Sequence, residues 1–322
     1  MPRPWTLFTL AAAALSAPPS GAVAGEPFSG WELEGEVAGA LVGGHTTYHI
    51  DIVDPTATAA SELEFPLGGF LVGLRARAAT RREQESDRWV FQLSGFLSGA
   101  GGSGTMRDSD WLDNAADVQV VGAAHPGKDI YSESDATLHA RVLEARVHWE
   151  LHPTPGWAVG PVAGLLHERF EYDVRNANQL GYGPYAASFT GFTPGPVLDY
   201  EVSYRIVYAG ARAALVRGEL TATAEVWASP FAAAEDRDDH LLRGKVGTTE
   251  ANGWAWQANL GGRLSLGGGH FLAMQASHGR VRATGTQHQV YYAGPDAGLR
   301  ADVAAIITSA QTVGSLSYLH RW

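Results

Sequence analysis

The sequence of 322 residues contains no cysteine and, after its N-terminal segment, no long apolar run. The absence of cysteine excludes a disulfide framework and a thiolate metal site. A helix needs roughly 20 apolar residues to cross a bilayer, and no later segment offers them. The mean hydropathy of -0.11 would suit a soluble protein. Transmembrane β-strands alternate apolar and polar residues, however, so their mean hydropathy is unremarkable. The hydropathy therefore does not exclude a transmembrane β-barrel.

The first residues have the composition of a targeting segment. Arg3 precedes a run rich in alanine and leucine, and a Pro-Pro break leads to the small-x-small site Ala22-Val23-Ala24. The apolar run is too short to cross a bilayer as a helix. We therefore predict that residues 1–24 are a cleaved signal peptide, with an uncleaved anchor as the alternative. Residues 25–322 are expected to form one domain.

Acidic residues outnumber basic ones, 34 to 23, which gives a net charge of -11. This excess argues against a nucleic acid partner and favours cationic partners. Two kinds of site motif are also absent. No Gly-x-Ser-x-Gly segment marks a serine nucleophile, and no Glu-x-x-His array marks a zinc site. Asp108, Asp238 and His240 are candidate metal ligands, but without such an array we predict no metal site.

Alternation of apolar and polar residues predicts β-strands along the whole mature chain. Residues 253–266 show it best, with Trp254, Trp256 and Leu260 on one face and Gln257, Asn259 and Arg263 on the other. Ten such runs occur, at residues 31–42, 69–79, 88–98, 137–151, 157–174, 198–216, 219–230, 253–266, 270–281 and 312–322. The chain ends on the aromatic Trp322. We predict an all-β fold, a ten-stranded antiparallel transmembrane β-barrel that projects above the outer membrane.

Short and long connections alternate between these runs. Tight turns are expected at residues 80–86, 152–156, 217–218 and 267–269, on the periplasmic side. Long loops are expected at residues 43–66, 99–136, 175–196, 231–252 and 282–311, on the outer side. Charged residues at inward positions are expected to form buried ion pairs; they are Glu32, Glu34, Glu36, Arg75, Arg77, Glu201, Arg205, Glu219, Glu225 and Arg263.

The first of two acidic clusters lies at residues 104–113, which read GTMRDSDWLD. Asp108 and Asp110 are two positions apart, so on an extended segment both carboxylates face the same side. Their mutual repulsion raises the proton affinity of at least one of them. Such a pair can hold and orient an attacking water. The alternative is that both are solvated turn residues.

The second cluster, Asp236-Arg237-Asp238-Asp239-His240, lies about 130 positions further along the chain. An aspartate pair that faces an Asp-x-His pair can hold a water and remove its proton, which suffices for hydrolysis without a metal or a nucleophilic side chain. The alternative is a solvated charge run on an outer loop.

The two clusters, in this order on a predicted barrel, resemble the omptin family of outer-membrane proteases. The resemblance extends over nearly all of the mature chain in strand order, whereas specific motifs cover only residues 104–113 and 236–240. It implies that Asp108 and Asp110 position the water and that His240 is the general base. Asp238 would orient and stabilise the imidazolium, as carboxylates do in other catalytic dyads.

The resemblance also implies a substrate pocket. Asp236 corresponds to an acid that receives a basic side chain before the scissile bond, and Met106 lines the other side of that bond. The family has a second acid in the pocket, but here Thr47 stands at its place. Glu62 or Glu64 is a candidate to supply the missing carboxylate.

A last implication concerns lipid. Arg169 matches one arginine of an exterior patch that binds lipopolysaccharide phosphates in the family, with an inward salt bridge as the alternative. Lipopolysaccharide is therefore expected as a partner and lipid activator, and no other cofactor is expected.

From these residues we predict an omptin-like endopeptidase in the bacterial outer membrane, with its active site facing the exterior. Its expected substrates are cationic peptides or proteins cleaved next to basic residues, and it is expected to act as a monomer. The alternative is a non-catalytic barrel that serves as an adhesin or a structural protein.

Overall fold

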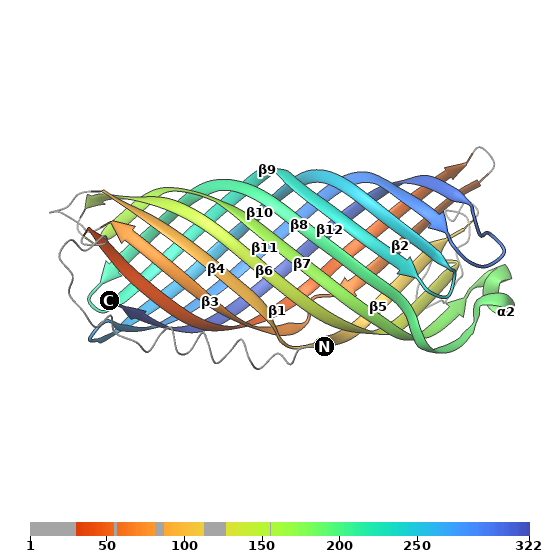
Figure 1. Ribbon diagram of the computed structural model, residues 1–322, viewed down its shortest axis with the longest axis horizontal. Helices are drawn as coiled ribbons and strands as arrows, with labels where there is room; N and C mark the ends of the chain where they lie inside the picture. Colours follow the sequence, from red (N-terminus) through yellow and green to blue (C-terminus); the bar gives the residue numbers. More distant parts are fainter. Residues whose placement is uncertain (1–29, 55–56, 81–86, 113–126, 155) are drawn as a thin grey trace.

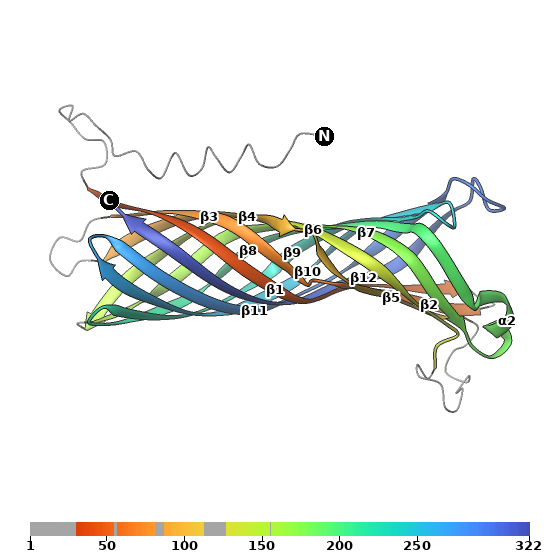
Figure 2. The same cartoon turned by 90° about the horizontal axis from the view of Figure 1, so that it is seen from below.

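The computed structural model describes residues 30–54, 57–80, 87–112, 127–154 and 156–322, which form one closed antiparallel sheet (Figures 1 and 2). The predicted signal peptide and Asp113 lie outside the described residues. The strands are β1 (Trp31–Asp54), β2 (Ala57–Pro66), β3 (Gly69–Thr80), β4 (Arg88–Ala100), β5 (Gly102–Trp111), β6 (Ile130–Thr154), β7 (Trp157–Gly181), β8 (Gly191–Arg217), β9 (Leu220–His240), β10 (Lys245–Gly267), β11 (His270–Tyr291) and β12 (Arg300–Arg321). Two short helical segments, η1 (Gly183–Tyr185) and α2 (Ala186–Phe189), join β7 to β8.

The barrel has ten strands at every level, which confirms the predicted fold. β2 and β3 both pair with β1, and β4 and β5 both pair with β6, so each of these pairs shares one place in the ring. The ring closes where β1 pairs with β12. Glycines lie where β2 gives way to β3 and where β4 gives way to β5. A Cβ on Gly102 would lie 2.0 Å from the carbonyl oxygen of Gly68, so only glycine fits there.

The strands are longer than predicted. β7 has 25 residues, which at about 3.3 Å per residue is roughly twice what a tilted strand needs to cross the membrane. The tight turns predicted at residues 217–218 and 267–269 are confirmed, at the end that also holds the C-terminus (Figure 1), whereas residues 81–86 and 155 of the other two lie outside the described residues. The predicted long loops are wrong, because most of their residues continue the strands beyond the membrane. No helix of the described residues is long and apolar enough to cross a membrane.

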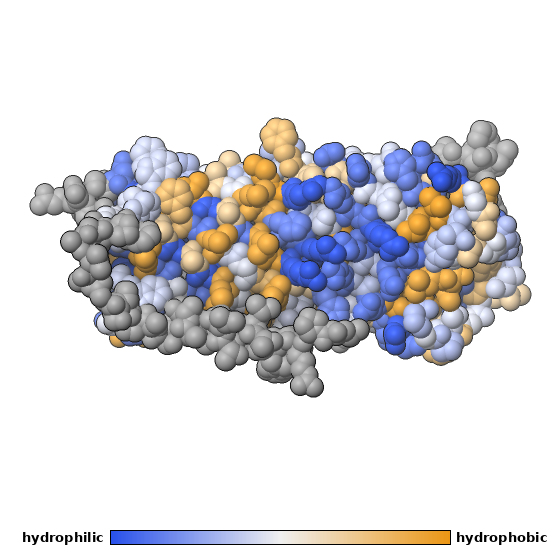
Figure 3. Space-filling model, in the orientation of Figure 1, coloured by the Kyte–Doolittle hydropathy of each residue, from blue (hydrophilic) through white to orange (hydrophobic). Residues whose placement is uncertain are grey.

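The outer surface divides the barrel into two parts. Figure 3 shows apolar residues gathered over the half with the tight turns, then a polar zone, and a second apolar group near the rim. Trp89, Trp157 and Tyr318 lie near the turn end of their strands, and Phe231 and Trp254 lie in mid-strand. Beyond Phe231 the outward residues of β9 become charged. The apolar half has the composition of a lipid-facing band with aromatic girdles.

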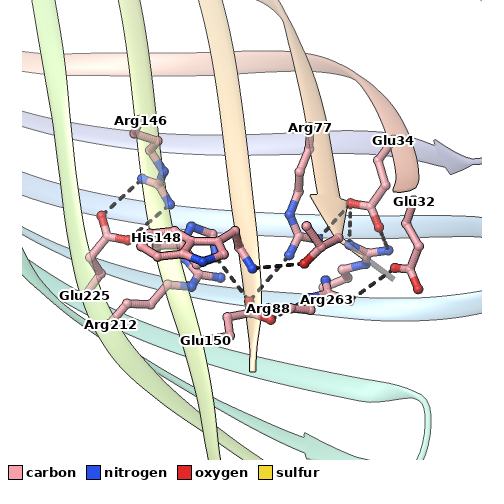
Figure 4. A network of polar contacts seen from close by, with 12 residues as sticks. Glu32, Glu34, Arg77, Arg88, Arg146, His148, Glu150, Arg212, Glu225 and Arg263 are labelled. Atoms are coloured by element: carbon pink, nitrogen blue, oxygen red, sulfur yellow. Dashed lines mark hydrogen bonds and ion pairs between the residues drawn. The ribbon is translucent and has the colours of Figure 1, made fainter. Parts of the chain in front are cut away.

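The interior is filled at three levels. Near the tight turns, buried glutamates and arginines from eight strands form a charge network (Figure 4). Glu34 contacts Arg77, Arg263 and Arg321, and Glu225 accepts two hydrogen bonds from Arg146. An aromatic layer follows above it, in which Tyr200 stacks on Phe65 with 4.1 Å between ring centroids and Tyr172, Tyr204 and Tyr48 are buried. The third level is the rim, and it carries the candidate site.

Candidate active site at the barrel rim

Both acidic clusters lie on strands at the end of the barrel opposite the C-terminus. Asp108 and Asp110 belong to β5, and Asp236, Asp238 and His240 belong to the end of β9. The expectation that they sit on loops was therefore wrong. Strand alternation turns residues two positions apart to the same face, so each cluster points its carboxylates into the barrel.

The first cluster is fixed by its neighbours on both faces of β5. The amide of Asp129 donates to the carbonyl oxygen of Asp110 at 2.9 Å, and the Asp129 carboxylate accepts from the amide of Leu112 at 2.6 Å. Between the two aspartates, the Ser109 hydroxyl accepts a hydrogen bond from Lys128 at 2.8 Å. The chain around Asp110 is thus held at both ends of the acidic pair.

The second cluster forms a close aspartate-histidine pair. His240 Nε2 lies 2.9 Å from Asp238 Oδ2, within ion-pair distance, and the Asp238 side chain is 1% exposed. Asp239 points the other way and accepts hydrogen bonds from Arg237 at 2.7 Å and from the Tyr292 hydroxyl at 3.0 Å. The structure therefore brings Asp238, and not the adjacent Asp239, to the histidine.

The two clusters meet in one cavity of about 260 Å³ at the mouth of the barrel. Asp110 lies on one wall, Asp238 and His240 on another, and Arg243 and Lys245 complete the charged lining. Arg243 Nη2 lies 3.5 Å from Asp110 Oδ2. Asp110 of the aspartate pair thus shares one space with the Asp238-His240 pair.

Burial and repulsion make Asp108 a strong proton acceptor. Burial and then the neighbouring Asp110 raise the pKa of Asp108 well above its usual range, whereas the cations of Arg243 and Lys245 oppose this. Among the described residues, Asp108 Oδ1 is buried without a hydrogen-bond partner. A carboxylate in this state is suited to accept a hydrogen bond from water or to share a proton with its neighbour.

Asp236 lies deeper in the same strand, buried beside two tyrosines. Its Oδ2 accepts a hydrogen bond from the Tyr200 hydroxyl at 3.2 Å, and its Oδ1 is buried with no partner among the residues that the structure describes. Burial raises the pKa of Asp236 to about 7. Tyr48 of β1 is close enough for the charge of Asp236 to raise the tyrosine pKa. Met106 is also buried, in the core below the rim.

Three predicted members of the pocket lie elsewhere. Thr46 and Tyr48 are buried inside the barrel, so alternation places Thr47 between them on the outer face. Glu62 lies 3.5 Å from His49, and Glu64 accepts a hydrogen bond from Arg107 at 2.6 Å, while Leu63 and Phe65 fill the interior. Tyr48, rather than a glutamate, is therefore the β1 residue that faces Asp236.

Arg169 points outward, on the polar part of the barrel surface. It is 39% exposed and contacts Glu171 at 2.8 Å and Glu201 at 2.7 Å. The alternative of an inward salt bridge was wrong. So was the inward assignment of Glu201 and Arg205, because Arg205 pairs on the outside with Glu235. Glu219 is exposed at a tight turn.

Sequence reasoning missed the two cations of the cavity and its tyrosines. The turn between β9 and β10 has only four residues, and β-pairing sets Lys245 directly opposite His240. Recognising Leu241–Gly244 as a tight turn would have placed Lys245 beside the histidine. In the described parts of the chain, no three His, Asp or Glu side chains come together in a way that could hold a metal ion.

Comparison with known proteins gives the family and the fold. The model of the Omptin family matches residues 80–260. No sequence among the curated proteins matches the chain. The crystal structure of the outer membrane protease OmpT from Escherichia coli superposes with a TM-score of 0.74 at 11% identity and covers 93% of this chain and 99% of its own.

Other outer-membrane barrels are much less similar in structure. The translocator domain of the autotransporter NalP from Neisseria meningitidis has a TM-score of 0.37 at 10% identity, covering 99% of this chain and 95% of its own. The outer membrane protein OprG from Pseudomonas aeruginosa has a TM-score of 0.34 at 10% identity, covering 90% and 95%. Since the family model matches more than half of the sequence, the chain belongs to the omptin family of outer-membrane β-barrel proteases.

Proposed function

We propose that this protein is an endopeptidase on the outer face of the outer membrane and that it hydrolyses polypeptides next to basic residues. The observation that carries the proposal is the shared cavity, in which buried Asp110 of the aspartate pair faces an aspartate-histidine pair with a 2.9 Å contact. This arrangement supplies a water site and a general base together.

His240 takes a proton from the water that attacks the scissile carbonyl. Because Nε2 faces Asp238, Nδ1 is the nitrogen left to accept that proton. The buried Asp238 carboxylate then stabilises the imidazolium and holds its ring in place. Asp108 and Asp110 accept hydrogen bonds from the water and orient it toward the carbonyl carbon.

Asp236 selects the residue before the scissile bond. Its buried, unpartnered Oδ1 accepts a hydrogen bond from a guanidinium or ammonium group, and the tyrosines enclose the aliphatic stem of such a side chain. One carboxylate in place of two weakens a strict demand for arginine over lysine. The net charge of -11 further attracts cationic polypeptides.

Orientation in the membrane follows from the two ends of the barrel. Bacterial barrels have short turns on the periplasmic side and longer connections outside, which directs the rim with Asp108 and His240 to the exterior. Arg169 lies above the apolar band and is our candidate contact for lipopolysaccharide phosphates, since arginine pairs well with phosphate. We propose lipopolysaccharide as an activator and a monomer as the active form.

The test is cleavage of quenched peptides by the refolded protein, with and without lipopolysaccharide. The peptides carry Arg-Arg, Lys-Arg, Arg-Lys or neutral junctions. We expect His240→Ala and Asp108→Asn each to lower kcat by at least about a hundredfold, because a positioned general base contributes roughly 10²–10⁴. Asp239→Asn is the matched control, since that carboxylate lies beside the dyad but faces outward.

Full activity in the His240→Ala variant would refute the mechanism. Failure of the unaltered protein to cleave any junction under either lipid condition would refute the protease, and would favour the alternative of an adhesin or structural barrel.

A further inference from the structure

Lys245, the first residue of β10, is a buried cation inside the proposed active site. Its side chain is among the buried ones, with the residue 5% exposed, and it lines the cavity that also contains Asp110, Asp238 and His240. In the β9–β10 pairing it stands directly opposite His240. Cross-strand partners have Cβ atoms about 5 Å apart, so the lysine stem starts beside the general base.

The ammonium group of Lys245 has no hydrogen-bond or ion-pair partner among the described residues. The other cation of the cavity differs in this respect, because Arg243 contacts Asp110 at 3.5 Å and half of its side chain is exposed. Nearby carboxylates compensate the charge of Lys245 only in part, because none of those described lies within ion-pair distance. The lysine is thus poised for an anion that arrives or forms in the cavity.

The groups that face Lys245 include three carboxylates. They are Asp238 and His240 from β9, Asp108 and Asp110 from β5, Arg243 from the turn, Tyr291 from β11 and Tyr48 from β1. Burial lowers the pKa of Lys245, and the surrounding carboxylates oppose this effect. The site therefore holds three carboxylates around the place where a carbonyl oxygen must become negative. Those carboxylates would repel an oxyanion unless a cation faced it.

We propose that Lys245 is a catalytic residue that donates a hydrogen bond from Nζ to the oxyanion of the tetrahedral intermediate. The proposal rests on the hydrolytic function proposed above. As the water oxygen bonds to the carbonyl carbon, its proton passes to His240 and the carbonyl electron pair moves onto oxygen. Lys245 keeps its proton and stabilises that charge. When the C–N bond breaks, the proton on His240 passes to the leaving amine.

Lys245→Met tests the role directly, with Arg237→Met as the matched control. Arg237 is also a cation at the rim, next to Asp238 in the sequence, but it is exposed on the outer face and pairs with Asp239. Removal of one oxyanion donor lowers kcat by about 10²–10³, so we expect a loss of that size with KM within about twofold. The control is expected to retain activity. Folding of each variant is checked by its heat-sensitive mobility on gels.

Lys245→Arg supplies a readout that a structural role would not change. A guanidinium keeps its charge at alkaline pH, so this variant is expected to recover part of the activity and to extend the alkaline limb of the pH–kcat profile upward. A Lys245→Met variant with kcat within fivefold of the unaltered protein would overturn the proposal. An alkaline limb that does not move in Lys245→Arg would also overturn the proposal. This second result tests the proposal even if Lys245→Met does not fold. Absence of cleavage by the unaltered protein would instead remove the proposed function itself.

Discussion

Replacing Asp236 by asparagine removes the carboxylate proposed to receive the basic side chain of the substrate. Asp236 is 6% exposed, and its pKa is raised to about 7 chiefly by burial and also by the charge of Asp238. An acid with a raised pKa is neutral below that pKa, and a neutral carboxyl group cannot form an ion pair with arginine. The preference for arginine should therefore appear only as the pH rises through about 7.

The magnitude follows from that titration. With a pKa of about 7, the ionised fraction of Asp236 falls about tenfold between pH 8 and pH 6. The ratio of kcat/KM for an arginine peptide over its neutral citrulline analogue should fall by the same factor. Because both peptides meet the same His240 and Asp108, the ratio cancels the titration of the catalytic groups.

In Asp236→Asn the ratio should lose this pH dependence and drop strongly at pH 8. Truncating one partner of a buried charge pair costs about 2–5 kcal/mol, which corresponds to roughly 30-fold or more in kcat/KM. Asp239→Asn, whose carboxylate faces outward, should keep both the ratio and its slope. A ratio that is flat between pH 6 and pH 8 in the unaltered protein, or an asparagine variant that still prefers arginine, would refute this reasoning.

Two further predictions concern other charges. Arg243 lowers the pKa of Asp108, so Arg243→Gln should move the acidic limb of the pH–kcat profile to higher pH. Its guanidinium lies 3.5 Å from Asp110 and is half exposed, so the charge contributes about 1 kcal/mol and the limb should move by less than about one pH unit. An acidic limb that does not move would contradict this role. Glu34→Gln should destabilise the barrel by about 3–5 kcal/mol, because it leaves Arg77, Arg263 and Arg321 around a neutral group. Urea unfolding in detergent measures this, and equal stability of Glu34→Gln and the more exposed Glu32→Gln would count against it.

The membrane half of the barrel was predictable because lipid imposes a clear pattern. There the outward residues are apolar and the inward ones are polar, as Val207 and Arg212 of β8 show. Beyond the apolar band the pattern inverts: Tyr200, Val202 and Tyr204 fill the interior, while Glu201 and Arg205 face water. The prediction applied the alternation of the membrane half to the whole strand. It therefore placed Glu201 and Arg205 inside the barrel and assigned the rim segments of the strands to loops.

The candidate site was predictable only where spacing alone decides which face a residue occupies. Asp108 with Asp110, and Asp238 with His240, stay on one side of a strand whatever their surroundings. The placement of Thr47 in the pocket depended instead on an alignment that is correct to the single residue. A shift of one residue moves a side chain to the other face of a strand. The position of Lys245 and Arg243 beside the Asp238-His240 pair depends on the length of the turn between β9 and β10, which alternation does not reveal. Residues brought in by pairing between strands are therefore the ones that a sequence pattern leaves out.

The filled barrel also explains why a site of this kind can be built from side chains on strands. Catalysis needs groups held to within about 0.5 Å, and loops rarely hold them so well. His240 pairs with Lys245 on β10, Asp239 beside it pairs with β8, and Asp110 pairs with β2 and β6. The aromatic layer below, with Phe65 stacked on Tyr200, fills the interior under the site. For the proposed endopeptidase, this filled interior favours a substrate that lies across the mouth as an extended, flexible segment rather than as a folded surface.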